Sequence, residues 1–375
     1  MALVTAPAAV VQGAVVPDVW FRIDGGMITD MGAGSLPDAE PADRIEGVVI
    51  PGFVDQHCHG GDRGDFFAAD EAAARRGAAI HLRHGTTTLV ASLVTATQDD
   101  LLDQIAVLTP LVDEGVLAGI HLEGPWLSGD RCGAHDPALL RPPRGAEVEQ
   151  LLVAGGGRII MATIAPELPG ADAAIAQLVA GGVVAAIGHT ACTAAQARQA
   201  IASGATVATH LFNQMPGIRK RDGGVVVALL DDPRVTVELI ADGVHVDPAV
   251  IRFVLQAVGA GRVAAVTDAM GAAGGPDGSY RIGALDVDVV DGVATLAGGG
   301  PLAGSTLTMD RALRTLVNEC GVDLAAASVV TSTTPARAMG LSDRGSLEAG
   351  RRADLVVLDD DLSVRAVMQA GSWVA

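Results

Sequence analysis

Residues 48–59 read VVIPGFVDQHCH, an apolar and largely β-branched run that ends in two histidines. On an extended strand His57 and His59 lie two residues apart and therefore point to the same side. Similar apolar runs recur along the chain, and most are followed by stretches rich in Ala, Leu, Arg and Asp. The eight runs are 48–57, 87–94, 116–123, 159–167, 183–190, 205–212, 235–242 and 263–270. Eight buried strands that alternate with helices predict an α/β fold, a (β/α)₈ TIM-type barrel.

The segments between and around these runs complete the expected architecture. Helical composition marks 70–84, 99–114, 147–153, 193–202, 248–258 and 309–320. Residues 1–47 and 343–375 instead read as short strands broken by turns, so we expect the two ends to form one small β-sandwich module. The barrel is then expected to occupy 48–342. It should carry a β-hairpin insertion around 272–304, where glycines and alternating apolar residues follow the eighth strand.

The overall charge is strongly negative. The 375 residues include 44 acidic and 25 basic side chains, which give a net charge of −19, and Lys220 is the one lysine among the basic residues. Non-specific binding of nucleic acid draws on clustered Lys and Arg, so we expect no nucleic-acid partner. With 49% hydrophobic and 18% charged residues, the chain can bury a large core. An anionic ligand would have to be bound by a local pocket.

Neither a membrane span nor an export signal is expected. The stretch 2–19 is apolar, but proline and glycine interrupt it and the first basic residue is Arg22, so the positive start of a signal peptide is missing. The cysteines are Cys58, Cys132, Cys192 and Cys320, and they form no CxxC pair. This usage favours free thiols and a cytoplasmic location.

Polar residues follow the predicted strands at or just beyond their carboxyl ends. They are His57, His59, His121, Glu123, His189, His210, His245 and Asp268. In a barrel the carboxyl ends of the strands share one face, where active sites of this fold lie. Imidazole and carboxylate groups are the ligands of zinc and similar divalent ions. Unpaired polar groups at a barrel mouth would each cost desolvation free energy, so the whole set predicts a metal site.

Three histidines have other interpretations. His81 and His84 lie in a helical stretch, and we interpret both as structural. His121 shares a strand face with Glu123, so it either supports a metal ligand from behind or packs in the core.

Five strings carry most of these residues: PGFVDQHCHGG at 51–61, HLEGP at 121–125, GHT at 188–190, THLFN at 209–213 and TDAM at 267–270. Together they resemble the N-acetylglucosamine-6-phosphate deacetylases of the amidohydrolase superfamily, and the similarity extends over essentially the whole chain. The HxH pair and the aspartate of the eighth strand are widespread in the superfamily. The HLEGP and HLFN strings are more specific to the deacetylases.

The resemblance implies a divalent metal centre, with zinc as the expected ion. Glu123, His189 and His210 match the principal ligands of the family. His57 and His59 match the pair that builds a second metal site, with Glu123 as the bridge. Some members lack this pair and use one ion, so its presence favours two ions per subunit over one.

The resemblance also implies the reaction. The substrate would be N-acetylglucosamine 6-phosphate, hydrolysed to glucosamine 6-phosphate and acetate with a metal-bound hydroxide as nucleophile. Asp268 matches the general base and acid, and is also a metal contact. His135 matches the histidine that polarises the acetamide carbonyl.

The substrate's phosphate accounts for further positions. The family's phosphate contacts match Arg221 and His245, together with the backbone of Asn213 and Gln214. A guanidinium suits phosphate because its planar fork offers several donors. The resemblance implies a homodimer in which Arg221 reaches the neighbouring subunit's site. Arg219, in the same basic run, stays an alternative.

Two other functions stay open at this point. One is another amidohydrolase that acts on an N-acyl amino acid, a cyclic amide or an amino-purine. Such enzymes commonly bridge their metals with a carboxylated lysine at a strand end, whereas Lys220 lies in a Gly/Arg-rich loop. The other is a non-catalytic amidohydrolase-like scaffold, which would have lost ligands that are all present here. Cys132 is either an oxidation-sensitive or gating thiol or a loop thiol without a role.

Overall fold

Eight parallel strands form the barrel in the computed structural model, which describes residues 2–34 and 42–374. The strands are β6 (Phe53–Cys58), β9 (Thr86–Leu93), β10 (Gly119–Glu123), β11 (Ile159–Ile164), β12 (Val184–Ile187), β13 (Val207–Ala208), β14 (Thr236–Ile240) and β15 (Val263–Val266). They pair in sequence order from β6 to β15. A parallel bridge joins Cys58, the last residue of β6, to Ala269, which lies three residues beyond β15. The predicted (β/α)₈ barrel is confirmed.

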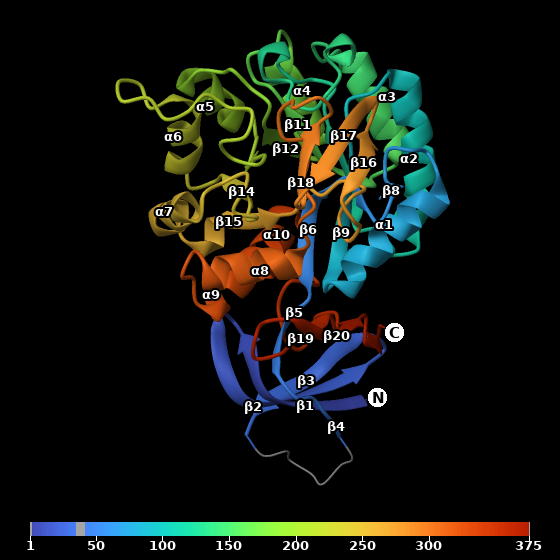
Figure 1. Ribbon diagram of the computed structural model, residues 1–375, viewed down its shortest axis with the longest axis vertical. Coiled ribbons are helices and arrows are strands. Elements are labelled where there is room, and N and C mark those ends of the chain that lie inside the picture. The colour runs from blue at the N-terminus through green and yellow to red at the C-terminus, as the bar shows by residue number, and fades with distance from the viewer. Residues whose placement is uncertain (1, 35–41, 375) are drawn as a thin grey trace.

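Helices surround the barrel (Figure 1). They are α1 (Glu71–Arg83), α2 (Gln98–Asp113), α3 (Gly145–Gly155), α4 (Ala171–Ala180), α5 (Ala194–Ala202), α6 (Gly224–Asp231), α7 (Pro248–Val258), α8 (Met309–Asn318), α9 (Leu324–Ser328) and α10 (Thr334–Ala338). Short helical turns occur at η1 (Gly129–Arg131), η2 (Pro137–Leu139), η3 (Ala260–Arg262) and η4 (Val329–Thr333). The six predicted helical stretches are all helical, whereas α4, α6, α9 and α10 lie in stretches that were not predicted as helices.

Side-chain caps explain where several of these helices begin. Asp70 accepts a hydrogen bond from the backbone N–H of Ala72 at the start of α1. Thr193 and Gln196 form a reciprocal capping box at the start of α5. Each cap satisfies backbone donors that have no partner within the helix. No described helix is both long enough and apolar enough to cross a membrane.

A second sheet is built from both ends of the chain (Figure 1). Its strands are β1 (Ala2–Val11), β2 (Ala14–Asp24), β3 (Met27–Ala33), β4 (Asp43–Arg44), β5 (Val48–Pro51), β19 (Leu355–Leu358), β20 (Val364–Gln369) and β21 (Ser372–Trp373). The N-terminal strand β5 pairs antiparallel with the C-terminal strand β19. The terminal segments therefore form one joint β module, as predicted, with its own core of buried residues that includes Val4, Phe21, Ile28 and Leu355.

The run 48–57, expected as one strand, is two strands. Residues 48–51 belong to the terminal sheet, and the barrel strand begins at Phe53. The turn between them is at Gly52, where a Cβ atom would collide with the side chain of Thr87. The terminal module therefore lies against the end of the barrel where β6 and β9 begin, and Gln369 donates there to the backbone oxygen of Thr87. The carboxyl ends of the strands lie on the opposite side.

The insertion after the eighth strand is larger than a simple hairpin. Three antiparallel strands, β16 (Gly278–Ile282), β17 (Leu285–Val290) and β18 (Val293–Leu296), follow one another. Their apolar side chains pack with Met270 and Ala272, in the segment between the barrel's last strand and β16. The insertion thus covers the carboxyl end of the barrel (Figure 1). At the same end, the short strands β7 (Gly60–Gly61) and β8 (Gly64–Asp65) form a turn after β6.

Candidate metal centre and active site

The barrel strands deliver the predicted residues to one place. His57 lies within β6 and Glu123 is the last residue of β10, while His189, His210 and Asp268 follow β12, β13 and β15. The last three have positive φ angles of 45°, 26° and 48°. Left-handed backbone is uncommon for residues other than glycine and persists where the surrounding structure demands it, often at functional sites. The strand ends are therefore bent to present these side chains.

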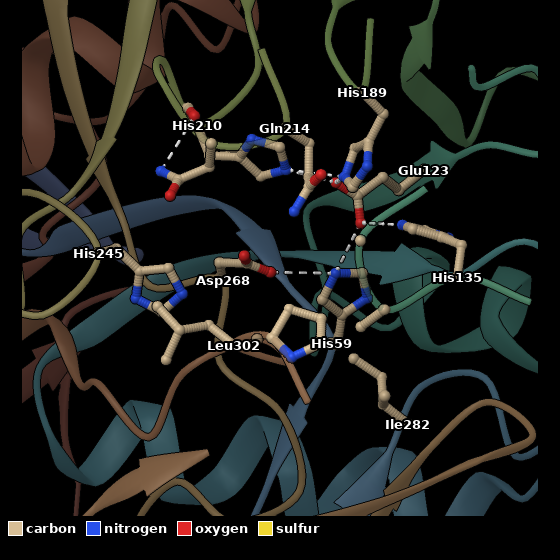
Figure 2. Close-up of a pocket in the computed structure, with 15 residues that line it drawn as sticks. His59, Glu123, His135, His189, His210, Gln214, His245, Asp268, Ile282 and Leu302 are labelled. Atoms are coloured by element: carbon tan, nitrogen blue, oxygen red, sulfur yellow. Dashed lines mark hydrogen bonds and ion pairs between the residues drawn. The ribbon is translucent and has the colours of Figure 1, made fainter. Parts of the chain in front are cut away.

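Glu123 is the centre of the cluster (Figure 2). Its Oε1 atom lies 3.2 Å from Nε2 of His189 and 3.0 Å from Nε2 of His210. Its Oε2 atom lies 3.0 Å from Nε2 of His59, and Oε1 lies 3.3 Å from Nε2 of His57. One buried carboxylate thus touches both histidine pairs, as a bridging ligand must.

Asp268 completes the half of the cluster that contains the HxH pair. Its Oδ1 atom lies 3.2 Å from Nε2 of His59 and 3.6 Å from Nε2 of His57. Burial alone would raise the pKa of Asp268, but the neighbouring His57 and His59 outweigh it and hold the pKa well below its ordinary value. Asp268 is therefore ionised at neutral pH and available as a base or a ligand.

Hydrogen bonds on the side away from Glu123 fix which ring nitrogen of His59 and of His189 faces the centre of the cluster. Nδ1 of His59 lies 3.1 Å from the backbone oxygen of Ser92, and Nδ1 of His189 lies 2.9 Å from that of Arg131. A carbonyl oxygen can only accept, so each Nδ1 carries a proton and donates it. In the neutral ring the Nε2 atom is then left with a free lone pair that points to Glu123. This is the arrangement of metal-ligating histidines.

The donor atoms fit a cation. Nε2 of His57 lies 3.3 Å from Nε2 of His59, and the Nε2 atoms of His189 and His210 are 3.0 Å apart. Where both Nδ1 atoms donate outward, as those of His57 and His59 do to Glu238 and to the backbone oxygen of Ser92, the two Nε2 lone pairs repel each other unless positive charge lies between them. Imidazole nitrogens and carboxylate oxygens in this number suit zinc and similar divalent ions. His57, His59, Glu123 and Asp268 form one group of converging ligand atoms, so these residues fit a metal centre.

The pKa values of His59 and His57 also favour a cation at this site. Burial would lower the pKa of His59, but its hydrogen bonds with Asp268 and Glu123 raise that pKa to about 9. The pKa of His57 is likewise raised well above its ordinary value, because the charges of Glu123 and Asp268 outweigh burial. The two carboxylates thus stabilise positive charge at this site, which is a proton on Nε2 without metal and which a divalent cation would supply in the proton's place.

His135 differs from the other site histidines. Its Nδ1 atom accepts a hydrogen bond of 3.3 Å from the backbone N–H of Thr95. The proton of the neutral ring is therefore on Nε2, which lies 3.4 Å from Oε2 of Glu123. Although Glu123, His135 and His189 also satisfy the spacing of a metal site, the tautomer makes His135 a donor toward the centre rather than a ligand.

A cavity of about 270 Å³ opens over the cluster. Its lining includes His59, Glu123, His135, His189, His210, Asn213, Gln214, His245 and Asp268. His245 is oriented by Asp242, whose Oδ2 lies 2.7 Å from Nδ1 of the ring. The insertion supplies the apolar side chains Ile282 and Leu302. In Figure 2 these lie on one side of Asp268 and His59, and His189 and His210 lie on the other.

Arg221 is the one predicted site residue that the chain does not bring to the cluster. It is exposed in the loop before α6 and does not line the cavity. Arg219 in the same loop is 2.9 Å from Asp222, which holds it locally. Lys220 is an exposed residue of the same loop, between β13 and α6, and therefore does not lie at a strand end.

The remaining histidines and Cys132 lie outside the cavity. His81 is a buried residue of α1 and lies 2.9 Å from the backbone oxygen of Gly60, and His84, just after α1, lies 3.2 Å from Asp310. His121 lies in the barrel interior between the hydroxyls of Ser92 and Thr163. Its ring is 4.7 Å from that of His57, so it packs behind a ligand. Cys132 is half-buried in the loop between η1 and His135.

Glu238 was missed by the sequence-based prediction. It lies inside β14, is fully buried, and its Oε2 atom is 3.1 Å from Nδ1 of His57. The one available signal was an acidic residue in the apolar run VTVELI at 235–240. Strand alternation alone does not tell the inner from the outer face of a barrel strand, because both are apolar.

Several proteins are similar to this chain over most of its length. A mutant N-acetyl-D-glucosamine-6-phosphate deacetylase from Mycobacterium smegmatis, solved in complex with N-acetyl-D-glucosamine-6-phosphate, is 51% identical with a TM-score of 0.97 and covers 99% of this chain and 98% of its own. The N-acetylglucosamine-6-phosphate deacetylase of Danio rerio is 37% identical over 342 residues, 87% of this chain and 84% of that protein. An N-acetylgalactosamine-6-phosphate deacetylase from Escherichia coli O157:H7 is 36% identical over 334 residues, 88% of each chain.

The family assignment agrees with the geometry. The model of the amidohydrolase family matches residues 48–374, which contain every barrel strand and every residue of the cluster. The barrel, the histidine and carboxylate ligands at its strand ends, and these similarities lead to one conclusion: this chain belongs to the amidohydrolase family.

Proposed function

We propose that this protein hydrolyses the acetamide of N-acetylglucosamine 6-phosphate to glucosamine 6-phosphate and acetate. The observation that carries the proposal is the convergence on Glu123 of histidine Nε2 lone pairs, beside an ionised Asp268 and a donating His135, in one cavity. The similarity to deacetylases of this substrate over nearly the whole chain supports it.

The proposed cofactor is zinc, one or two ions per subunit. Glu123, His189 and His210 would hold one ion, and His57, His59 and Glu123 the other, with Asp268 as a further contact. A divalent ion held there lowers the pKa of its bound water from about 15.7 to about 7, so that a nucleophile is available at neutral pH. The intact HxH pair favours two ions.

Asp268 is the proposed general base and acid. Its carboxylate is ionised, lines the cavity and contacts His59. It takes one proton from the attacking water as oxygen bonds to the acetamide carbon. It then delivers that proton to the amine nitrogen as the carbon–nitrogen bond breaks, so that acetate and a free amino sugar leave.

His135 is the proposed donor to the acetamide oxygen. Because Thr95 occupies Nδ1, the proton on Nε2 points to the centre. Negative charge develops on the acetamide oxygen as the water adds, and a fixed donor stabilises that charge more than it stabilises the neutral substrate.

The phosphate is proposed to lie in the part of the cavity that His245 lines. His245 is oriented by Asp242 and lines the same cavity as Asn213 and Gln214, whose backbone groups are the other proposed phosphate contacts. Arg221 is exposed and outside this cavity, which supports a homodimer in which it serves the site of the neighbouring subunit. A guanidinium contributed in this way would add a charge-assisted, multi-donor contact with the phosphate.

A second substrate has a specific observation in its favour. The relative from Escherichia coli O157:H7 is named for N-acetylgalactosamine 6-phosphate, which differs in the configuration of one hydroxyl, and its identity of 36% is almost that of the Danio rerio enzyme. The alternatives that need a lysine bridge have less support, since Lys220 is exposed in a loop. A non-catalytic scaffold has less support too, because the ligands and the acid–base residue converge.

The setting of the enzyme is part of the proposal. Free cysteines and the strongly negative charge fit a cytoplasmic protein without a nucleic-acid partner. The division into a composite β module of the two ends and a catalytic barrel follows the two separate sheets.

The test removes metal with a chelator, restores zinc, and follows acetate release. Four substrates are compared: N-acetylglucosamine and N-acetylgalactosamine, each with and without the 6-phosphate. We expect zinc-dependent release that strongly prefers N-acetylglucosamine 6-phosphate. Equal rates with and without the phosphate would exclude the phosphate pocket, a preference for the galactose epimer would select the second substrate, and the absence of metal-dependent release would exclude a deacetylase.

A further inference from the structure

Glu238 lies beneath the metal centre, on the inner face of β14. Its side chain has no exposed surface. Three N–H groups of the described chain donate to its carboxylate: Oε1 accepts from Nε2 of Gln56 at 2.7 Å, and Oε2 accepts from Nδ1 of His57 and from the backbone N–H of His210 at 3.1 Å each. One side chain therefore connects β6, β13 and β14 directly behind the centre.

The carboxylate has different contacts with the two metal subsites. It binds the ring of His57, which belongs to the HxH pair, but only the backbone of His210, whose ring Nδ1 has no partner among the described residues. The other oriented ligands, His59 and His189, are held by neutral backbone oxygens. Among these three oriented rings, His57 alone has a charged partner, which fixes its tautomer and makes its Nε2 atom more basic.

We infer that Glu238 is a positioning residue that presents Nε2 of His57 to the second ion and so sets the metal affinity of the HxH subsite. The inference rests on the metal centre of the proposed function and extends it, since it makes occupancy of the second subsite depend on a residue that touches neither ion nor substrate.

A simple space-filling role does not account for this residue. Burying a carboxylate is unfavourable unless hydrogen bonds or opposite charge compensate it. The neighbouring histidine of the barrel interior, His121, is held by the hydroxyls of Ser92 and Thr163, so orienting a buried ring does not by itself require a carboxylate. The carboxylate also accepts from three donors at once. A glutamine would turn its own NH₂ group toward at least one of them.

The experiment compares the full-length parent with two variants. Glu238→Gln keeps the side-chain shape but removes the charge and one acceptor. Thr163→Val is the matched control, because it removes two buried hydrogen bonds in the barrel interior, with His121 and Thr209, neither of which is a proposed ligand. Metal-free protein is equilibrated with increasing free zinc, and bound ions per subunit are measured. A parallel series with Co²⁺ follows the absorption spectrum of the ligated ion, which reports ligand geometry independently of activity.

We expect the parent and Thr163→Val to bind two ions with the same affinities. In Glu238→Gln the second ion should bind about 10- to 100-fold more weakly, with the first nearly unchanged. Equal affinity for the second ion in all three proteins would overturn the inference. So would equal weakening of both ions, which would indicate general loosening of the barrel.

A measurement on the parent protects the test against a variant that does not fold. In ¹⁵N-histidine NMR spectra, the signals of the His57 ring are assigned as those that disappear in His57→Asn. During a zinc titration of the parent, this ring should keep its Nδ1 proton, and its Nε2 resonance should shift when the second ion binds. Binding through Nδ1, or the lack of any response of that ring, would overturn the inference. A parent that binds one ion and is active would overturn this inference alone. A parent that binds none would remove the proposed function as well.

Discussion

The backbone N–H of Thr95 donates a hydrogen bond of 3.3 Å to Nδ1 of His135. This contact reverses the tautomer of His135 relative to His59 and His189, whose Nδ1 atoms are donors to backbone oxygens. Histidine rings that contact the same carboxylate, that of Glu123, therefore have opposite hydrogen-bonding roles. His59 and His189 offer lone pairs, and His135 offers a proton.

Replacing His135 by alanine should lower kcat by about 10²- to 10³-fold, the usual loss on removal of one donor to a developing oxyanion. Metal content should stay that of the parent, because His135 is proposed as a donor and not as a ligand. Steady-state kinetics together with metal analysis check both points. His84→Gln, which changes a histidine outside the cavity, serves as the control. Loss of zinc from His135→Ala would instead make His135 a ligand.

Replacing Asp268 by asparagine should reduce kcat by about 10²- to 10⁴-fold, since the ionised carboxylate that moves the proton is lost. Glu123, His189 and His210 remain, so at least one zinc should still bind. Single-turnover acetate release and metal analysis on the same sample measure the two effects. Retained turnover would show that another group handles the proton.

Replacing Arg221 by alanine should raise KM for the phosphorylated sugar by about 10- to 100-fold with little change in kcat, because a hydrogen bond to a charged group contributes about 1.5–3 kcal/mol. Arg219→Ala is the matched control in the same loop, since Asp222 already holds Arg219. The assay compares sugars with and without the phosphate. A raised KM in Arg219→Ala alone would transfer the phosphate contact to Arg219.

Mixing subunits separates a contact within the chain from a contact across a dimer. Arg221→Ala and Asp268→Asn are each nearly inactive at low substrate. If Arg221 serves the neighbouring site, a mixed dimer contains one site with both defects and one site with neither. Activity should therefore reappear on mixing, and it should stay absent if Arg221 acts on its own subunit's cavity.

Ile282 is expected to limit the size of the acyl group. It lines the cavity from the insertion, together with Leu302 and with Ala134 beside His135. Ile282→Ala should raise kcat/KM for the N-propionyl or N-butyryl sugar relative to the acetyl sugar by about tenfold or more, the range that one methylene contributes in an apolar pocket. An unchanged ratio would place the acyl group elsewhere in the cavity.

Asp310 should make the fold sensitive to acid. Burial alone would raise its pKa, but its hydrogen bond with His84 and the nearby Arg314 lower that pKa to about 2. In the unfolded chain the value is about 3.9. The ionised form is therefore stabilised by folding, by roughly 2 kcal/mol at neutral pH. This stabilisation is present above about pH 4 and is lost as the pH falls toward about 2.

Asp310→Asn should accordingly lower the unfolding temperature at pH 7, and its difference from the parent should shrink as the pH falls from about 4 to 2. Thermal unfolding followed by circular dichroism across this range measures the difference. Asp103→Asn, on the exposed side of α2, is the control and should show no such dependence. A difference that stays constant with pH would mean that Asp310 contributes by packing alone.

The sequence by itself predicted the barrel and the convergence of most candidate ligands at one end of it, because buried parallel strands have a recognisable pattern and their carboxyl ends must meet. His57, His59, Glu123, His189, His210 and Asp268 could be grouped on that ground. The pattern did not separate residues 48–51 from β6, since both pieces are apolar and extended. They differ in the strands with which they pair, because residues 48–51 pair with β19 and β6 pairs with β9.

Only the tertiary structure decided what each site residue contributes. Glu238 lies among apolar residues of β14, and only folding brings it to His57, which is 181 residues earlier, and to the backbone of His210 after the neighbouring strand β13. The tautomer of His135 depends on Thr95, some forty residues earlier in the chain. Residue type sets which chemistry is available to a side chain. The direction of its protons and lone pairs is set by neighbours that only folding brings within hydrogen-bond distance.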